Sequence, residues 1–69
     1  MRELRVLIIP EERRPNENEI WEALSFANEK CCIVELRWFT PHFGWKNWLI
    51  RPEDNIEELL KNLNIEHSI

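Results

Sequence analysis

Two adjacent cysteines and two histidines are the side chains of this sequence best suited to nucleophilic or metal chemistry. They are Cys31, Cys32, His42 and His67. A thiol is activated by a histidine within hydrogen-bond reach, but Cys31 and His42 stand at opposite ends of an expected strand, about 30 Å apart by strand rise. Adjacent strand residues also point to opposite faces, so the two thiols diverge from a shared metal or disulfide. We therefore expect no metal, no cofactor and no enzyme.

Aromatic and basic residues gather in one segment, residues 36–51. Five of the seven aromatic residues and three basic residues fall there, and no acidic residue does. Planar rings stack on unpaired bases and cations meet phosphates, which is how sheet-based proteins bind single strands. Tryptophan and arginine are equally enriched at protein interfaces. The segment thus predicts a surface for a protein or a nucleic acid, with these candidate residues: Arg37, Phe39, His42, Phe43, Trp45, Lys46 and Arg51.

The charge balance separates these two interpretations. Thirteen acidic residues face nine lysines and arginines, which gives a formal net charge of −4. Nucleic-acid binding depends on neutralising phosphates, so this balance disfavours it. Both expected helices are acidic, which suits a solvated surface or one that steers a partner. We expect a protein partner and keep single-stranded nucleic acid as the alternative.

The elements that position this segment follow from hydrophobic periodicity. Residues 4–9 are apolar on both alternating faces, which predicts a strand in the middle of a sheet. Asn16 and Glu19 have the spacing of a capping box and open a helix over residues 16–29. Its apolar stripe is Ile20, Ala23, Leu24 and Ala27.

The second half of the chain predicts a hairpin and a second helix. Residues 31–39 and 45–50 are rich in β-branched and aromatic side chains, and a turn at 40–44 holds the single glycine. Pro52 opens a helix, with Asp54 and Glu57 at capping-box spacing. Asn64 suits the end of that helix, and residues 65–69 are long enough for a short last strand.

These elements predict the fold class. The order βαββα, with an optional final β, indicates a single α+β domain over residues 1–69, a two-layer sandwich. Two helices would pack on one face of a mainly antiparallel sheet. The full six-element order is ferredoxin-like, and in that topology the first and third strands are central.

Two helices can cover only one face of such a sheet, so the other face needs a partner. Leu7, Ile9, Trp45 and Leu49 would be exposed together there, and a monomer rarely tolerates such a patch. A chain this short also buries a marginal core. We therefore expect a homodimer whose interface contains these four residues.

The same observations set the expected function and location. No apolar run reaches the roughly 20 residues of a membrane-spanning helix, and the N-terminal segment lacks a secretory pattern. A cytoplasmic protein is expected. Its function would be that of a non-enzymatic interaction or regulatory module, homodimeric and binding another protein, with a single-stranded nucleic-acid binder as the alternative.

Overall fold

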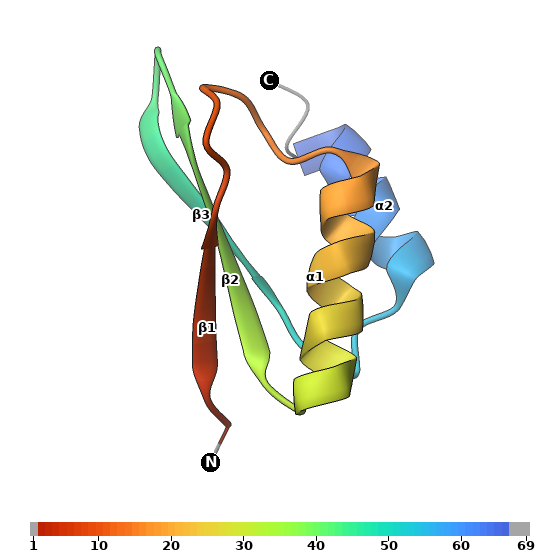
Figure 1. The fold of residues 1–69 in the computed structure, drawn as a ribbon. Helices are drawn as coiled ribbons and strands as arrows, with labels where there is room; N and C mark the ends of the chain where they lie inside the picture. Colours follow the sequence, from red (N-terminus) through yellow and green to blue (C-terminus); the bar gives the residue numbers. More distant parts are fainter. Residues whose placement is uncertain (1, 67–69) are drawn as a thin grey trace.

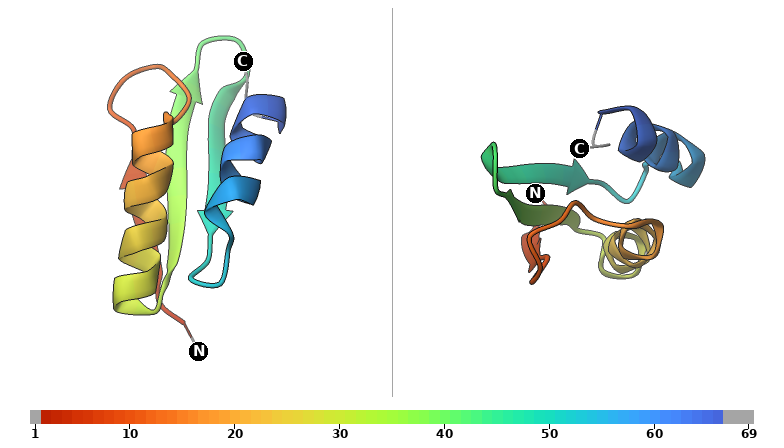
Figure 2. Two further views of the ribbon diagram at one scale, coloured as in Figure 1. Left: turned by 90° about the vertical axis from the view of Figure 1, so that its right-hand side faces the viewer. Right: turned by 90° about the horizontal axis from the view of Figure 1, so that it is seen from above.

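The computed structural model describes residues 2–66, which form a three-stranded sheet and two helices. The elements run β1 (Leu4–Ile8), α1 (Glu17–Lys30), β2 (Ile33–Thr40), β3 (Gly44–Ile50) and α2 (Ile56–Glu66). The predicted α+β class and the order of these five elements are confirmed. Both helices lie on the same side of the sheet (Figure 1). Seen from the helix side and from above, that arrangement is a layer of helices over a layer of strands (Figure 2).

The sheet has the order β1-β2-β3, with β1 parallel and β3 antiparallel to β2. The expectation that the first and third strands are central was wrong, because β2 is central and the other two are edge strands. The sheet is accordingly mixed, without the ferredoxin-like strand order. The physical reason is the crossover through α1, which returns the chain directly beside β1 and so makes the two strands parallel neighbours.

The register of the strands determines which side chains share a face. Leu7 and Trp48 both pair with Leu36, on the side covered by the helices. The alternate residues lie on the opposite side, where the described residues leave the sheet uncovered (Figure 1). We call this side the open face; its residues are Leu4, Val6, Ile8, Ile33, Glu35, Arg37, Phe39, Trp45, Asn47 and Leu49.

This assignment corrects half of the expected dimer patch. Trp45 and Leu49 do lie on the open face and are exposed. Leu7 and Ile9 lie on the opposite side, because parallel pairing with β2 turns them toward the helices; Ile9 is 6% exposed there, whereas Leu7 at the sheet edge keeps 39% of its surface exposed. The residues of β1 that belong to the open face are Leu4, Val6 and Ile8.

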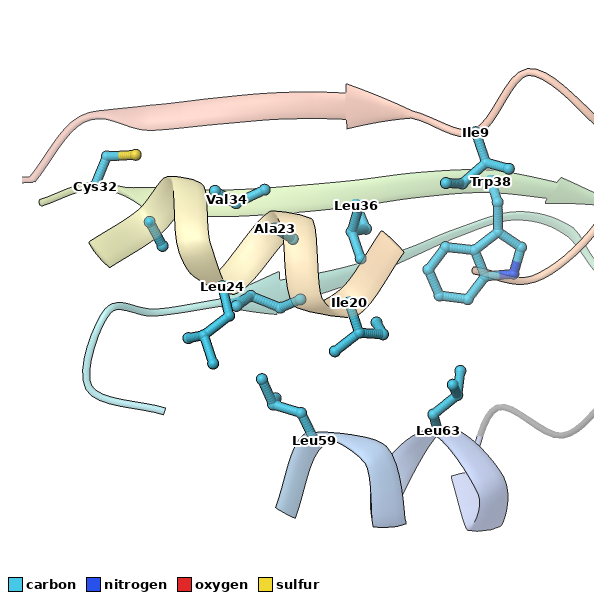
Figure 3. Packing of buried hydrophobic residues seen from close by; sticks show 12 residues of the cluster. Ile9, Ile20, Ala23, Leu24, Cys32, Val34, Leu36, Trp38, Leu59 and Leu63 are labelled. Carbon is cyan, nitrogen blue, oxygen red and sulfur yellow. The ribbon is translucent and has the colours of Figure 1, made fainter. Parts of the chain in front are cut away.

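The hydrophobic core lies between the sheet and the helices (Figure 3). The predicted stripe of α1 is buried. Trp38 of β2, with 1% of its surface exposed, is the largest fully buried side chain. Leu59 and Leu63 bring α2 into the same cluster, as Figure 3 shows. Phe26 of α1 is partly buried and packs against the same cluster.

Helix α1 begins and ends at residues with defined capping geometry. The Asn16 side chain accepts from the Glu19 N–H at 2.9 Å, and Glu19 Oε1 accepts from the Asn16 N–H at 2.9 Å, so the predicted capping box is confirmed. Cys31 follows the helix with φ 52°, a left-handed conformation. The Cys32 N–H then donates to the Ala27 carbonyl at 3.1 Å. These two residues therefore close a helix rather than start a strand, and β2 begins at Ile33.

Helix α2 also differs at its ends from the prediction. It begins at Ile56, and the Asn55 side chain, not that of Asp54, accepts from the Glu57 N–H at 2.8 Å. Its last turn lacks a basic residue, but Arg14 Nη1 donates to the Leu63 carbonyl at 3.0 Å from the loop before α1. The expected last strand is not formed at residues 65 and 66, which belong to α2, and residues 67–69 lie outside the described part.

Candidate interaction surface

A polar cluster occupies the centre of the open face. Glu35 and Arg37 are two positions apart on β2 and therefore point to the same side. Arg37 Nη2 donates to Glu35 Oε1 at 3.2 Å, and Arg37 Nε lies 3.2 Å from Oε2. Asn47, the register partner of Arg37 on β3, donates to Oε2 at 3.0 Å. Both carboxylate oxygens of Glu35 are thus hydrogen-bonded within the chain.

The charge state of Glu35 follows from these contacts. The hydrogen bond from Arg37, then that from Asn47, hold the pKa of this carboxyl below its usual value, although desolvation opposes them. Glu35 is buried, with 6% of its surface exposed. The centre of the open face is therefore an ionised carboxylate that is buried and neutralised by Arg37, whose own side chain is 47% exposed.

Apolar side chains surround this cluster. Val6 pairs with Glu35 from β1, and Leu49 pairs with it from β3. Leu4 and Ile8 extend the apolar surface along β1, and Ile8 is 59% exposed. A shallow hollow of about 470 Å³ crosses the middle of this surface, lined by Ile8, Glu35, Arg37, Trp45, Lys46 and Asn47.

The turn between β2 and β3 carries an aromatic cluster, which we call the hairpin tip (Phe39, His42, Phe43, Trp45 and Lys46). The Phe39 and Trp45 rings meet edge to face, with centroids 5.6 Å apart. Lys46 Nζ lies 5.1 Å from the centroid of the Phe43 ring, a cation–π contact. Trp45 and Phe43 nevertheless expose 63% and 60% of their surface. The tip therefore presents planar apolar surface together with a cation.

The structure brings six of the seven predicted binding residues toward one end of the sheet. Arg37 lies on the open face and the other five form the hairpin tip. Arg51 is separate: it follows the far end of β3, and its N–H donates to Asp54 Oδ2 at 2.8 Å. The two remaining tryptophans of the hairpin face the helices, Trp38 buried and Trp48 partly buried against the core.

Sequence reasoning missed Glu35 and Asn47 as parts of the site. The signal was present, since an acid two positions before an arginine in a strand places both on one face. What the sequence did not show is that Asn47 lies opposite Arg37, which depends on the hairpin register. The β1 residues of the open face were missed because the alternate set, Leu7 and Ile9, was assigned to that face.

The positions of the cysteines and His42 match no nucleophile–base pair. Cys31 is exposed beyond the end of α1, Cys32 is buried, and His42 lies in the turn, where its ring meets that of Phe43. Within residues 2–66 no group of three or more His, Cys, Asp and Glu side chains is arranged to hold a metal ion. His67 lies outside the described part.

In the described part of the chain, neither helix has the length and apolar character needed to cross a bilayer. Searches against protein-family models, curated proteins and solved structures find no match to this chain.

Proposed function

We propose that this chain is a non-enzymatic protein-interaction or regulatory module that works as a homodimer in the cytoplasm. In this proposal the open face, including Phe39 and Trp45, is the contact between two copies, and the rest of the hairpin tip, His42, Phe43 and Lys46, is the contact to another protein. One observation carries the proposal: exposed apolar side chains surround Glu35, a carboxylate whose two oxygens already have hydrogen-bond partners.

The energetics of covering this face support a protein partner. Burying an unpaired charge is costly, but Glu35 is already desolvated and paired in the single chain. Covering the surrounding apolar surface gains about 25 cal/mol per Å². Tryptophan and arginine, here Trp45 and Arg37, are also among the residue types that dominate binding energy at interfaces.

A dilution series in light scattering tests the homodimer. The wild-type chain should have the mass of a dimer at high concentration and dissociate on dilution. Trp45→Glu should give a monomer, because the charge would enter the open face. Trp21→Glu is the matched control, since Trp21 is similarly exposed but lies on α1. A monomeric wild type, or a dimer that Trp45→Glu leaves intact, would contradict the proposal.

Single-stranded nucleic acid is the second candidate, and the hairpin tip favours it. Exposed Phe43 and Trp45 rings beside Lys46 suit base stacking and phosphate contact. The pairing of Arg37 with Glu35 weighs against it, because this cation is already neutralised. Anisotropy of a labelled oligonucleotide decides: binding that strengthens as salt falls, and is lost in Trp45→Ala and Lys46→Ala, would establish this function. Absence of binding at low salt would exclude it.

A further inference from the structure

We infer that two copies pack open face to open face about a two-fold axis that crosses the strands between Glu35 and Arg37. This inference rests on the proposed homodimer and specifies its geometry. The occupant of the open face is then a second copy of the chain, bound by the same residues in return.

The register gives the open face two central rows of side chains. One row is Val6, Glu35 and Leu49, and the next is Ile8, Arg37 and Asn47. A two-fold axis between these rows exchanges them, so that each row lies over the other row of the partner. Two sheets stacked in this way lie about 10 Å apart, with their inner side chains in contact.

Charge complementarity selects this axis. It places Arg37 over Glu35 of the partner subunit, and Glu35 over Arg37 of the partner subunit. An axis through the Arg37 row would instead set two arginines against each other, and an axis through the Glu35 row would oppose two carboxylates. Arg37 has five N–H donors; Nη2 donates to Glu35 Oε1, and Nε lies 3.2 Å from Glu35 Oε2. Its other donors are available to the partner's Glu35.

The apolar residues of β1 and β2 are matched by the same operation, whereas Leu49 of β3 lies over Asn47 of the partner subunit. Val6 lies over Ile8 of the partner subunit on the β1 side. Ile33 meets Phe39 of the partner subunit, so that apolar surface covers apolar surface at both ends. The face measures roughly 14 Å by 23 Å from ordinary strand spacing and rise, which corresponds to a small interface. Small interfaces are weak, so this dimer should dissociate on dilution.

Mixing two charged variants tests the axis. Val6→Lys alone places a lysine over the partner's Ile8, and Ile8→Glu alone places a glutamate over the partner's Val6. Each variant should lose at least about tenfold in self-affinity. An equimolar mixture should recover the dimer, because lysine and glutamate then face each other in the mixed pair. Both positions are exposed, so the fold is retained, which far-UV circular dichroism checks.

The control is a mixture of Val6→Lys with Trp45→Glu, whose charges lie on different edge strands and do not meet across this axis. That mixture should stay monomeric. Recovery in the first mixture alone supports the axis. Suppose that the wild type is a dimer and that Trp45→Glu abolishes it. If the two mixtures then behave alike, both recovering the dimer or both staying monomeric, the axis is wrong while the homodimer stands. If the wild type is monomeric, the proposed function fails together with this inference.

Discussion

Arg37 holds the carboxylate of Glu35 with two of its nitrogen atoms, both at 3.2 Å, from a position two residues further along the same strand. The pair is local in sequence, so it forms wherever β2 is extended. Asn47 then adds a bond from the neighbouring strand. A buried acid on an uncovered sheet face is thereby stabilised within the single chain.

The pH dependence of stability should report on this pair. Because the folded chain holds the pKa of Glu35 below its unfolded value, Glu35 contributes stability that is fully present above about pH 4.3 and is lost as pH falls through the lower folded pKa. Urea unfolding should therefore show a decline in the free energy of unfolding below that pH. Glu35→Gln should make the decline shallower, as should Arg37→Met. A decline of unchanged steepness in both variants would contradict this account.

The left-handed conformation of Cys31 should be relieved by glycine. At φ 52° the Cβ of a side chain crowds the backbone, whereas glycine has no Cβ. Cys31→Gly should raise the free energy of unfolding by about 0.5–1 kcal/mol after allowing for the flexibility of glycine in the unfolded chain. Cys31→Ala keeps a Cβ and should gain nothing, which makes it the control in urea titrations. An equal gain in both variants would show that the conformation is not the cause.

Arg14 should stabilise the end of α2 through its bond to the Leu63 carbonyl. A cation is favourable at a helix C-terminus, and α2 provides none in its own last turn. Arg14→Met keeps the aliphatic stem and should lower the free energy of unfolding by about 1–2 kcal/mol. Arg5→Met removes the exposed pair with Glu3 and should change it by less than about 0.5 kcal/mol. If Arg14→Met and Arg5→Met lower the free energy of unfolding equally, Arg14 does not have the stabilising role assigned to it here.

Two neighbouring isoleucines test the face assignment of β1. Ile9 is 6% exposed in the core, and Ile8 is 59% exposed on the open face. In a Trp45→Glu background, which would remove the proposed dimer contact, Ile9→Ala should cost about 2–4 kcal/mol. Ile8→Ala should cost less than about 0.5 kcal/mol. The reverse order in thermal or urea unfolding would mean that β1 presents its other face to the helices.

Local signals in the sequence predicted the local elements well. The capping box at Asn16 and the four-residue stripe identify α1, because both depend on residues within one or two turns. The hairpin is equally local, and its turn contains Gly44 at φ 77°, a conformation that glycine accepts easily. Cys31 and Cys32 were assigned to the strand because their composition continues that of β2, and composition does not show where a helix stops.

Non-local relationships were beyond the sequence pattern. Residues 4–9 are apolar on both faces of the strand, which was interpreted as burial on both sides. A strand whose second face is apolar but uncovered has the same sequence pattern. The sequence of β1 does not show whether this strand pairs with β2 or with β3, and that pairing decides the strand order. The aromatic and basic segment was identified correctly as a cluster, whereas the separation of Arg51 from the hairpin tip needed the length of β3.

The pairing of β1 with β2 also has a consequence for the order in which the chain folds. Strands β2 and β3 are joined by a three-residue turn, whereas β1 pairs with residues about thirty positions later. Closing the longer loop costs more entropy, so we expect the hairpin to form early and β1 to dock late. Newly synthesised chains would then lack a third of the open face until their last folding step, and the proposed dimer would be unable to form before that step is complete.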